Sequence, residues 1–272
     1  MRYGSALLAT AALMLWGCGG DDASPPPITS PSPPPAPAPT PTPSPTPTPT
    51  PTPTPVTGTL DFTFAQDEDG FIPEISEYSP DTEFSTFEFR AEIDAVPNIG
   101  GNGYRIQSIN RSDDVFMFLW KPVTGLTPNQ RYRVDSTVRF AANVPLGCFG
   151  IGGSPSGVVI QAGASPVEPM LVVSTDAGDA GNLVPNFEHG VQNTEDGSPF
   201  TLGVIGQNIP GARCDGSGPY QVKELATDPD NAPVLTTDSE GRLWAFMGTD
   251  SPFEGLTVIY WLSGSFAFTP VQ

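Results

Sequence analysis

The chain is poor in basic residues and in histidine. Its 272 residues include 11 Lys plus Arg against 30 Asp plus Glu, which gives a formal net charge of −19, and a single histidine, His189. A charge of this sign repels the phosphates of nucleic acids and the surface of an anionic membrane. We therefore expect neither as a partner, and a solvated acidic surface is the default interpretation of the charge.

The sequence also lacks the motifs of common hydrolases and of nucleotide-binding proteins. It has no G-x-S-x-G motif, and His189 lies beside Glu188 in a Gly/Asn/Pro-rich stretch where we expect an exposed loop residue. The glycine-rich GIGGSPSG at 150–157 lacks the Lys-Ser/Thr ending of a phosphate-binding loop. Among 30 acidic residues, carboxylate pairs at the spacing of a glycoside hydrolase arise by chance. We therefore expect no catalysis.

No segment carries apolar residues at helical spacing for three turns, whereas the chain has 29 Gly and 34 Pro. Short runs alternate apolar and polar residues instead, most regularly at 131–140, where five residues from Tyr132 to Phe140 share one face. Many short strands separated by turn formers are typical of a sandwich or barrel. We predict an all-β domain, an antiparallel β-sandwich of the jelly-roll kind.

The strands are predicted from alternation and from β-branched and aromatic content. The stretch 66–80 is predicted to be an irregular acidic loop. The expected strands are 59–64, 84–93, 104–109, 115–121, 131–140, 147–153, 158–162, 170–174, 200–205, 220–225, 243–247 and 256–268.

The N-terminal fifth of the chain has a composition that excludes a packed core. Residues 1–18 have a basic start and an apolar run too short to span a bilayer, the layout of a secretory signal peptide. Residues 19–58 are rich in Pro and Thr, so we expect a disordered stalk that populates polyproline II. The remaining residues, 59–272, are enough for one domain with a sizeable core.

Three cysteines are present. Cys18 ends the predicted signal peptide, which leaves Cys148 and Cys214 in the domain. An even pair in an exported protein more often forms a disulfide than stays as two free thiols. Neither cysteine has a C-x-x-C neighbour, which argues against a zinc or redox site.

Acidic loops are candidate calcium sites, because Ca²⁺ binds clustered carboxylate and carbonyl oxygens. Three loops qualify by composition, at 67–70, 176–179 and 228–231, and we name Asp67 and Asp69 as the candidate Ca²⁺ ligands. None completes a twelve-residue EF-hand loop. In the alternative interpretation each Asp caps the backbone of its own turn and no cofactor is bound.

A sugar-binding site would use exposed aromatic faces flanked by polar side chains. The tryptophans lie in predicted strands, where an aromatic residue is more often core, but consecutive Tyr260 and Trp261 face opposite ways and at least one is expected to point outward. Polar residues gather at the entrance of the strand that begins at 115. The candidate ligand-binding residues are Asn110, Arg111, Asp113, Asp114, Trp120 and Trp261.

The end of the apolar N-terminal run, Leu15-Trp16-Gly17-Cys18, resembles the lipobox of bacterial lipoproteins. This resemblance implies cleavage before Cys18 and acylation of that cysteine, for example with palmitate. Since Gly19 follows Cys18 and no Asp does, it also implies transfer to the outer membrane or cell surface. The alternative is an ordinary cleaved signal with a chance cysteine.

Four phrases of the domain are similar to a group of bacterial secreted proteins and lipoproteins that have a jelly-roll domain and no agreed function. They are Ser112-Asp113-Asp114, VTGLTPNQRYRV, GCFGIGGSPSG and GRLWAFMGTDSPFEGLTVIY. The second phrase also resembles one in galactose-binding-like carbohydrate-binding modules. The likeness covers most of 59–272 and implies a jelly-roll fold, and it assigns no catalytic or ligand residue.

From these observations we expect an exported, lipid-anchored protein that displays a non-catalytic binding domain, with a glycan or another extracellular polymer as its ligand. The first alternative is a structural or adhesion protein whose domain contacts another protein. The second is a cell-surface hydrolase. Nothing in the sequence indicates an oligomeric state.

Overall fold

The computed structural model describes residues 54–111, 114–195 and 197–272. They belong to a compact unit, Thr52–Gln272. The predicted signal peptide, Cys18 and most of the predicted stalk lie outside the described residues. Within the described ranges the regular structure consists of strands and two short 3₁₀ helices, η1 (Phe84–Phe87) and η2 (Pro155–Gly157), so the all-β prediction is confirmed. Neither helix approaches the length and apolar character that crossing a bilayer demands.

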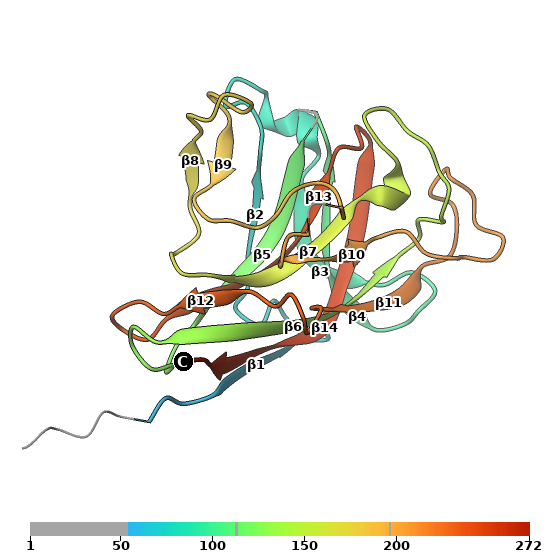
Figure 1. The fold of residues 1–272 in the computed structure, drawn as a ribbon. Coiled ribbons are helices and arrows are strands. Elements are labelled where there is room, and N and C mark those ends of the chain that lie inside the picture. Colours follow the sequence, from blue (N-terminus) through green and yellow to red (C-terminus); the bar gives the residue numbers. More distant parts are fainter. Residues whose placement is uncertain (1–53, 112–113, 196) are drawn as a thin grey trace, which may run out of the picture. The chain divides into compact units, whose positions relative to one another are not determined.

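Two antiparallel sheets form a sandwich (Figure 1). The strands of the seven-stranded sheet are β1 (Gly58–Thr63), β3 (Arg90–Ala95), β4 (Asn102–Ile109), β6 (Arg131–Ala142), β11 (Gln221–Ala226), β12 (Val234–Thr236) and β14 (Leu256–Pro270). Those of the five-stranded sheet are β2 (Ile72–Ser76), β5 (Val115–Val123), β7 (Val159–Ser165), β10 (Thr201–Val204) and β13 (Leu243–Ser251). A separate pair comprises β8 (Leu171–Val173) and β9 (Leu183–Pro185).

The order of strands places β6 and β14 at the centre of the larger sheet. That order is β11-β6-β14-β4-β3, with β1 added on β14 and β12 on β6, and the smaller sheet has the order β10-β7-β13-β5-β2. The alternation predicted at 131–140 is confirmed in β6, because Tyr132, Val134, Val138 and Phe140 are completely buried in the core between the sheets. The regular period therefore marks a central scaffold strand.

The five-stranded sheet is buried on both of its faces. Met117 and Leu119 of β5 point into the main core, whereas Phe116 and Phe118 point outward into a second aromatic cluster. Phe187 and Phe200, from the chain that follows β9, cover this outer face together with Phe246 of β13. A strand buried on both faces is apolar along its whole length, and this explains the uninterrupted run VFMFLW of β5.

Several predicted elements are corrected. Residues 147–153 form a loop and no strand, because Gly147 and Gly152 adopt positive φ angles of 79° and 73° that an extended strand excludes. The predicted strand 84–93 is divided between η1 and β3. The predicted loop 66–80 contains the edge strand β2, and β9 and β12 are too short for their patterns to be recognised.

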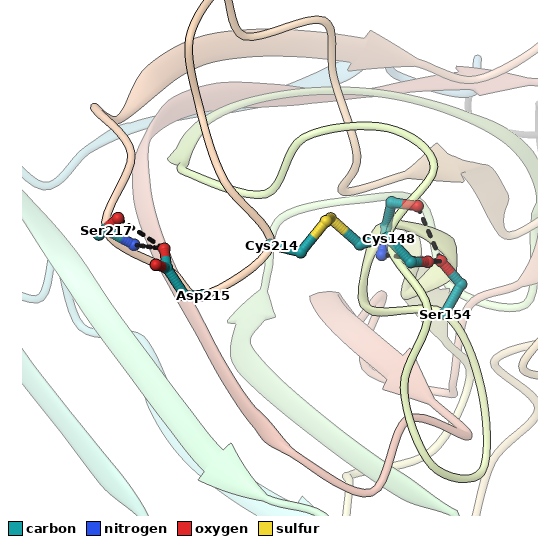
Figure 2. The surroundings of a disulfide bond; sticks show 6 residues. Cys148, Ser154, Cys214, Asp215 and Ser217 are labelled. Atoms are coloured by element: carbon teal, nitrogen blue, oxygen red, sulfur yellow. Dashed lines mark hydrogen bonds between the residues drawn. A yellow bond between two sulfur atoms is a disulfide. The ribbon is translucent and has the colours of Figure 1, made fainter.

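Cys148 and Cys214 are joined by a disulfide bond, with a Cα–Cα distance of 5.5 Å (Figure 2). The bond ties the β6–β7 connection to the β10–β11 connection across a sequence separation of 66 residues. The Oγ of Ser154 donates a 2.5 Å hydrogen bond to the carbonyl oxygen of Cys148 and so braces the first of these two loops (Figure 2).

Replacing Cys148 with serine should destabilise the domain. In the chain-entropy description a loop of this length contributes about 4 kcal/mol, which corresponds to a fall of roughly 10 °C in Tm. Thermal unfolding of the purified protein without reductant measures the effect. Wild-type protein treated with reductant is the matched control and should melt with the variant. An unchanged Tm in both samples would contradict the stabilising role.

Candidate functional site

The two loops that the disulfide joins enclose a cavity of about 400 Å³. Phe149 and Pro155 line it from the first loop, and Arg213 and Asp215 line it from the second. Phe253, which precedes β14, and Val258, which lies in β14, complete the wall. We call this cavity the disulfide pocket. Its volume lies in the range of small-molecule sites.

Phe149 is the most exposed large apolar side chain of the described residues. It is 94% exposed, and its neighbours Leu146 and Ile151 are 60% and 74% exposed. An apolar patch of this kind on a domain surface marks a place of contact with another molecule more often than a chance arrangement. The disulfide and the Ser154 hydrogen bond hold the loop that presents Phe149, so the backbone at this position is fixed before any ligand arrives.

The polar side of the disulfide pocket is organised around Asp215. Its Oδ1 accepts hydrogen bonds from the Oγ of Ser217 at 2.5 Å and from the backbone N–H of Ser217 at 3.0 Å (Figure 2). These hydrogen bonds, the side-chain one above all, lower the pKa of Asp215, so the group is a carboxylate acceptor at neutral pH. The exposed guanidinium of Arg213 supplies donors to the same pocket.

A second group of ionisable side chains converges at one end of the five-stranded sheet. Glu77 follows β2, Asp114 precedes β5, and Asp250 lies in β13. One carboxylate oxygen of each lies within 4.8 Å of the others. We call these three residues the carboxylate cluster. Asp250 is only 1% exposed, because it points toward the covered outer face of the sheet, as Phe246 of the same strand does.

His189 covers the carboxylate cluster and is 5% exposed, so the expectation of an exposed loop residue was wrong. Its ring stacks on Phe116 with 4.0 Å between centroids and an interplanar angle of 3°. Its Nδ1 lies 2.9 Å from Oε1 of Gln161, and its Nε2 lies 3.1 Å from Oε1 of Glu77. The aromatic cover of the sheet accounts for the burial, since His189 lies two residues after Phe187.

The amide of Gln161 orients the ring of His189. The Nε2 of Gln161 donates to Oδ2 of Asp250 at 3.1 Å and to the carbonyl oxygen of Val191 at 3.2 Å. Its Oε1 therefore faces His189 and accepts from Nδ1. The other ring nitrogen, Nε2, is engaged by the carboxyl group of Glu77.

Burial raises the pKa of Asp250 well above its usual value, and the charges of Glu77 and then Asp114 raise it further. The carboxyl group of Asp114 also comes within hydrogen-bonding reach of Asp250. Two carboxyl groups can hydrogen bond to each other only when one is protonated. Asp250 therefore holds a proton more tightly than an exposed aspartate does.

Of the candidate ligand-binding residues that the structure describes, Asp114 alone joins a group of ionisable side chains. Asp114 belongs to the carboxylate cluster. Asn110 is buried and its Nδ2 donates to the carbonyl oxygen of Ser251 at 2.7 Å, while the exposed Arg111 donates from Nε to the carbonyl oxygen of Thr86 at 3.1 Å. Asp113 lies outside the described residues.

The predicted aromatic platform is corrected. Trp261 is completely buried and Tyr260 is 4% exposed, because the outer face of β14 at this point is covered by Tyr220 and Val96. Trp120 is half-buried and packs against the aromatic cluster on the outer face of the smaller sheet. Both tryptophans that were candidate sugar platforms therefore pack inside the domain, Trp261 completely and Trp120 in part.

The predicted calcium ligands Asp67 and Asp69 are not brought together as a metal site. Oδ1 of Asp67 accepts a hydrogen bond from the backbone N–H of Asp69, as a turn-capping residue does. Nζ of Lys121 lies 3.1 Å from Oδ1 of Asp69 and neutralises that carboxylate. The capping interpretation of this loop is the one that its hydrogen bonds support.

The sequence interpretation missed Glu77, Asp250 and Phe149. A single acidic residue at the end of the apolar stretch LWAFMGTDS is a signal that could have identified Asp250, because a buried carboxylate requires compensation. Glu77 has a positive φ of 69°, which the sequence does not reveal.

In a buffer that contains a chelator of divalent cations, ionisation of Asp250 should lower the stability of the folded domain. The raised pKa means that the stabilising protonated state is present below about pH 4 and is lost as pH rises through the folded-state value. We expect the Tm of the wild type to fall relative to that of Asp250→Asn, which mimics the neutral acid, as pH rises from 5 to roughly 8. A constant difference between the two melting curves would contradict this.

Comparisons with known proteins identify no family for the chain. No protein-family profile matches it, and no curated protein does. Among solved structures it is similar to the K1 cleaved adhesin domain of Lys-gingipain from Porphyromonas gingivalis W83, at 11% sequence identity and a TM-score of 0.32. The match covers 79% of this chain and 99% of that domain. A likeness this distant transfers no function.

Proposed function

We propose that this protein is a non-catalytic binding protein of the cell surface whose disulfide pocket holds a sugar residue of an extracellular glycan. The observation that carries this proposal is the ring of Phe149, 94% exposed beside a cavity of about 400 Å³ and held there by a disulfide-tied loop. A pre-positioned aromatic face next to a small cavity supplies contact area at low entropic cost.

The side chains of the pocket match the chemistry of a sugar. The C–H groups of a pyranose ring pack on an aromatic face, and its hydroxyl groups need both donors and acceptors. Arg213 supplies donors and Asp215 supplies an ionised acceptor to the same pocket. One cation and one anion in the pocket, in a chain of net charge −19, favour an uncharged glycan over a polyanionic one.

A second candidate function is adhesion to another protein. It is favoured by the exposed apolar side chains of Leu146 and Ile151, which flank Phe149 on the same loop. Protein interfaces place such side chains at their centre. In that function the loop binds as a surface, and the polar residues of the pocket contribute little.

Binding of the purified full-length protein to a glycan array tests the first function. We expect selective binding to neutral glycans. Phe149→Ala should weaken it at least tenfold, since truncation of a central aromatic contact commonly costs about 2 kcal/mol. Val173→Ala, which shortens a side chain that is 61% exposed on β8, is the matched control and should leave binding unchanged. A blank array, or equal binding by Phe149→Ala, would exclude the sugar proposal.

We also propose that the domain is tethered to the membrane by an acyl chain on Cys18, at the end of the Pro/Thr-rich stalk. This rests on the lipobox-like sequence that ends at Cys18, since a net charge of −19 gives the chain no electrostatic attraction to anionic lipid. Labelling cells with radioactive palmitate should mark the wild-type protein. Cys18→Ser should lose the label and move to the soluble fraction. Label retained by the variant would contradict the assignment.

A further inference from the structure

We propose that the carboxylate cluster of Glu77, Asp114 and Asp250 is a calcium site that links three elements of the five-stranded sheet. One oxygen of each residue lies within 4.8 Å of the others, so a single cation can contact all three. Calcium takes about six to eight oxygen ligands and accepts carboxylates in one- or two-oxygen contact. The three carboxylates supply at least three of these oxygens from side chains.

The buried oxygen of Asp250 is independent support for a ligand at this position. Asp250 is 1% exposed, and its Oδ2 is held by the amide of Gln161. No donor among the described residues reaches its Oδ1, which is also buried. A buried carboxylate oxygen without a donor is costly unless a proton or a cation compensates it.

The charge of the surrounding groups fits a divalent ion. Three carboxylates with oxygens this close repel one another when they are ionised, and the aromatic cover on this face of the sheet limits screening by water. A divalent cation among them offsets that repulsion.

The donor set favours calcium over zinc and magnesium. All three groups offer oxygen, and both ring nitrogens of His189 are already engaged by Gln161 and Glu77, which removes the nitrogen ligand that zinc prefers. Magnesium demands a tight octahedron and retains several waters. A largely buried set of carboxylates from three elements suits the larger and less demanding ion.

Calcium titration of the chelator-treated, full-length protein tests the proposal. We expect one Ca²⁺ per chain by calorimetry and a rise in Tm of about 5 to 10 °C at a concentration roughly 100 times Kd, with a smaller rise in Mg²⁺.

Two variants and one control locate the site. Asp250→Asn should weaken Ca²⁺ binding at least tenfold, and Glu77→Gln, whose side chain is 16% exposed and therefore better tolerated, should do the same with an intact circular-dichroism spectrum. Asp176→Asn, in the exposed acidic loop 176–179, is the matched control and should bind as the wild type does. Absence of heat and of a Tm shift in the wild type would overturn the proposal, as would equal shifts in Ca²⁺ and Mg²⁺. Binding lost only in Asp176→Asn would also overturn it.

Discussion

The structure depends on the burial of the five-stranded sheet on both faces. Every residue of β13, from Leu243 to Ser251, is buried, with Met247 facing the main core and Phe246 facing the outer aromatic cluster. Phe187 and Phe200, from the connection after β9, supply part of the outer cover. Because water is excluded from both sides, any polar group of this strand has to be compensated within the protein. Asp250 is the residue to which that requirement applies most strongly.

How well the sequence predicts a strand depends on whether one face of that strand is exposed to solvent. The strand β6 has one buried face and an alternating sequence, so its period of two identified both its extent and its inner face. The strand β5 has two buried faces, so its sequence shows that it is buried and not which residues face which layer. Neither pattern reveals which strands pair with each other. The consecutive strands β5 and β6, for example, lie in different sheets.

The carboxylate cluster was predictable only in part, because the pairing register of the strands determines which residues meet there. Asp114 stands out as a polar residue at a strand entrance, but its neighbours are set by pairing: Asp250 of β13 lies opposite Phe116 of β5 and Val159 of β7. Glu77 lies near them because β2, which it follows, pairs with the edge of β5 that β13 leaves open. These contacts join residues up to 173 positions apart, counted from 250 minus 77, and no local pattern contains them. Phe149 was hidden because its glycine-rich loop was interpreted as a strand.

The carboxylate cluster and the disulfide pocket share one short segment of the chain. Phe253, which lines the pocket, lies three positions after Asp250. Between them, the carbonyl oxygen of Ser251 accepts from Asn110, and its Oγ accepts from the backbone N–H of Phe253 at 3.1 Å. A Cβ on Gly150 would lie 2.2 Å from the ring of Phe253, so this ring packs directly against the loop that presents Phe149. The backbone that carries Asp250 therefore leads within three positions to a ring that packs against the loop of Phe149, so the carboxylate cluster and the wall of the pocket are joined by one short, buried and hydrogen-bonded segment.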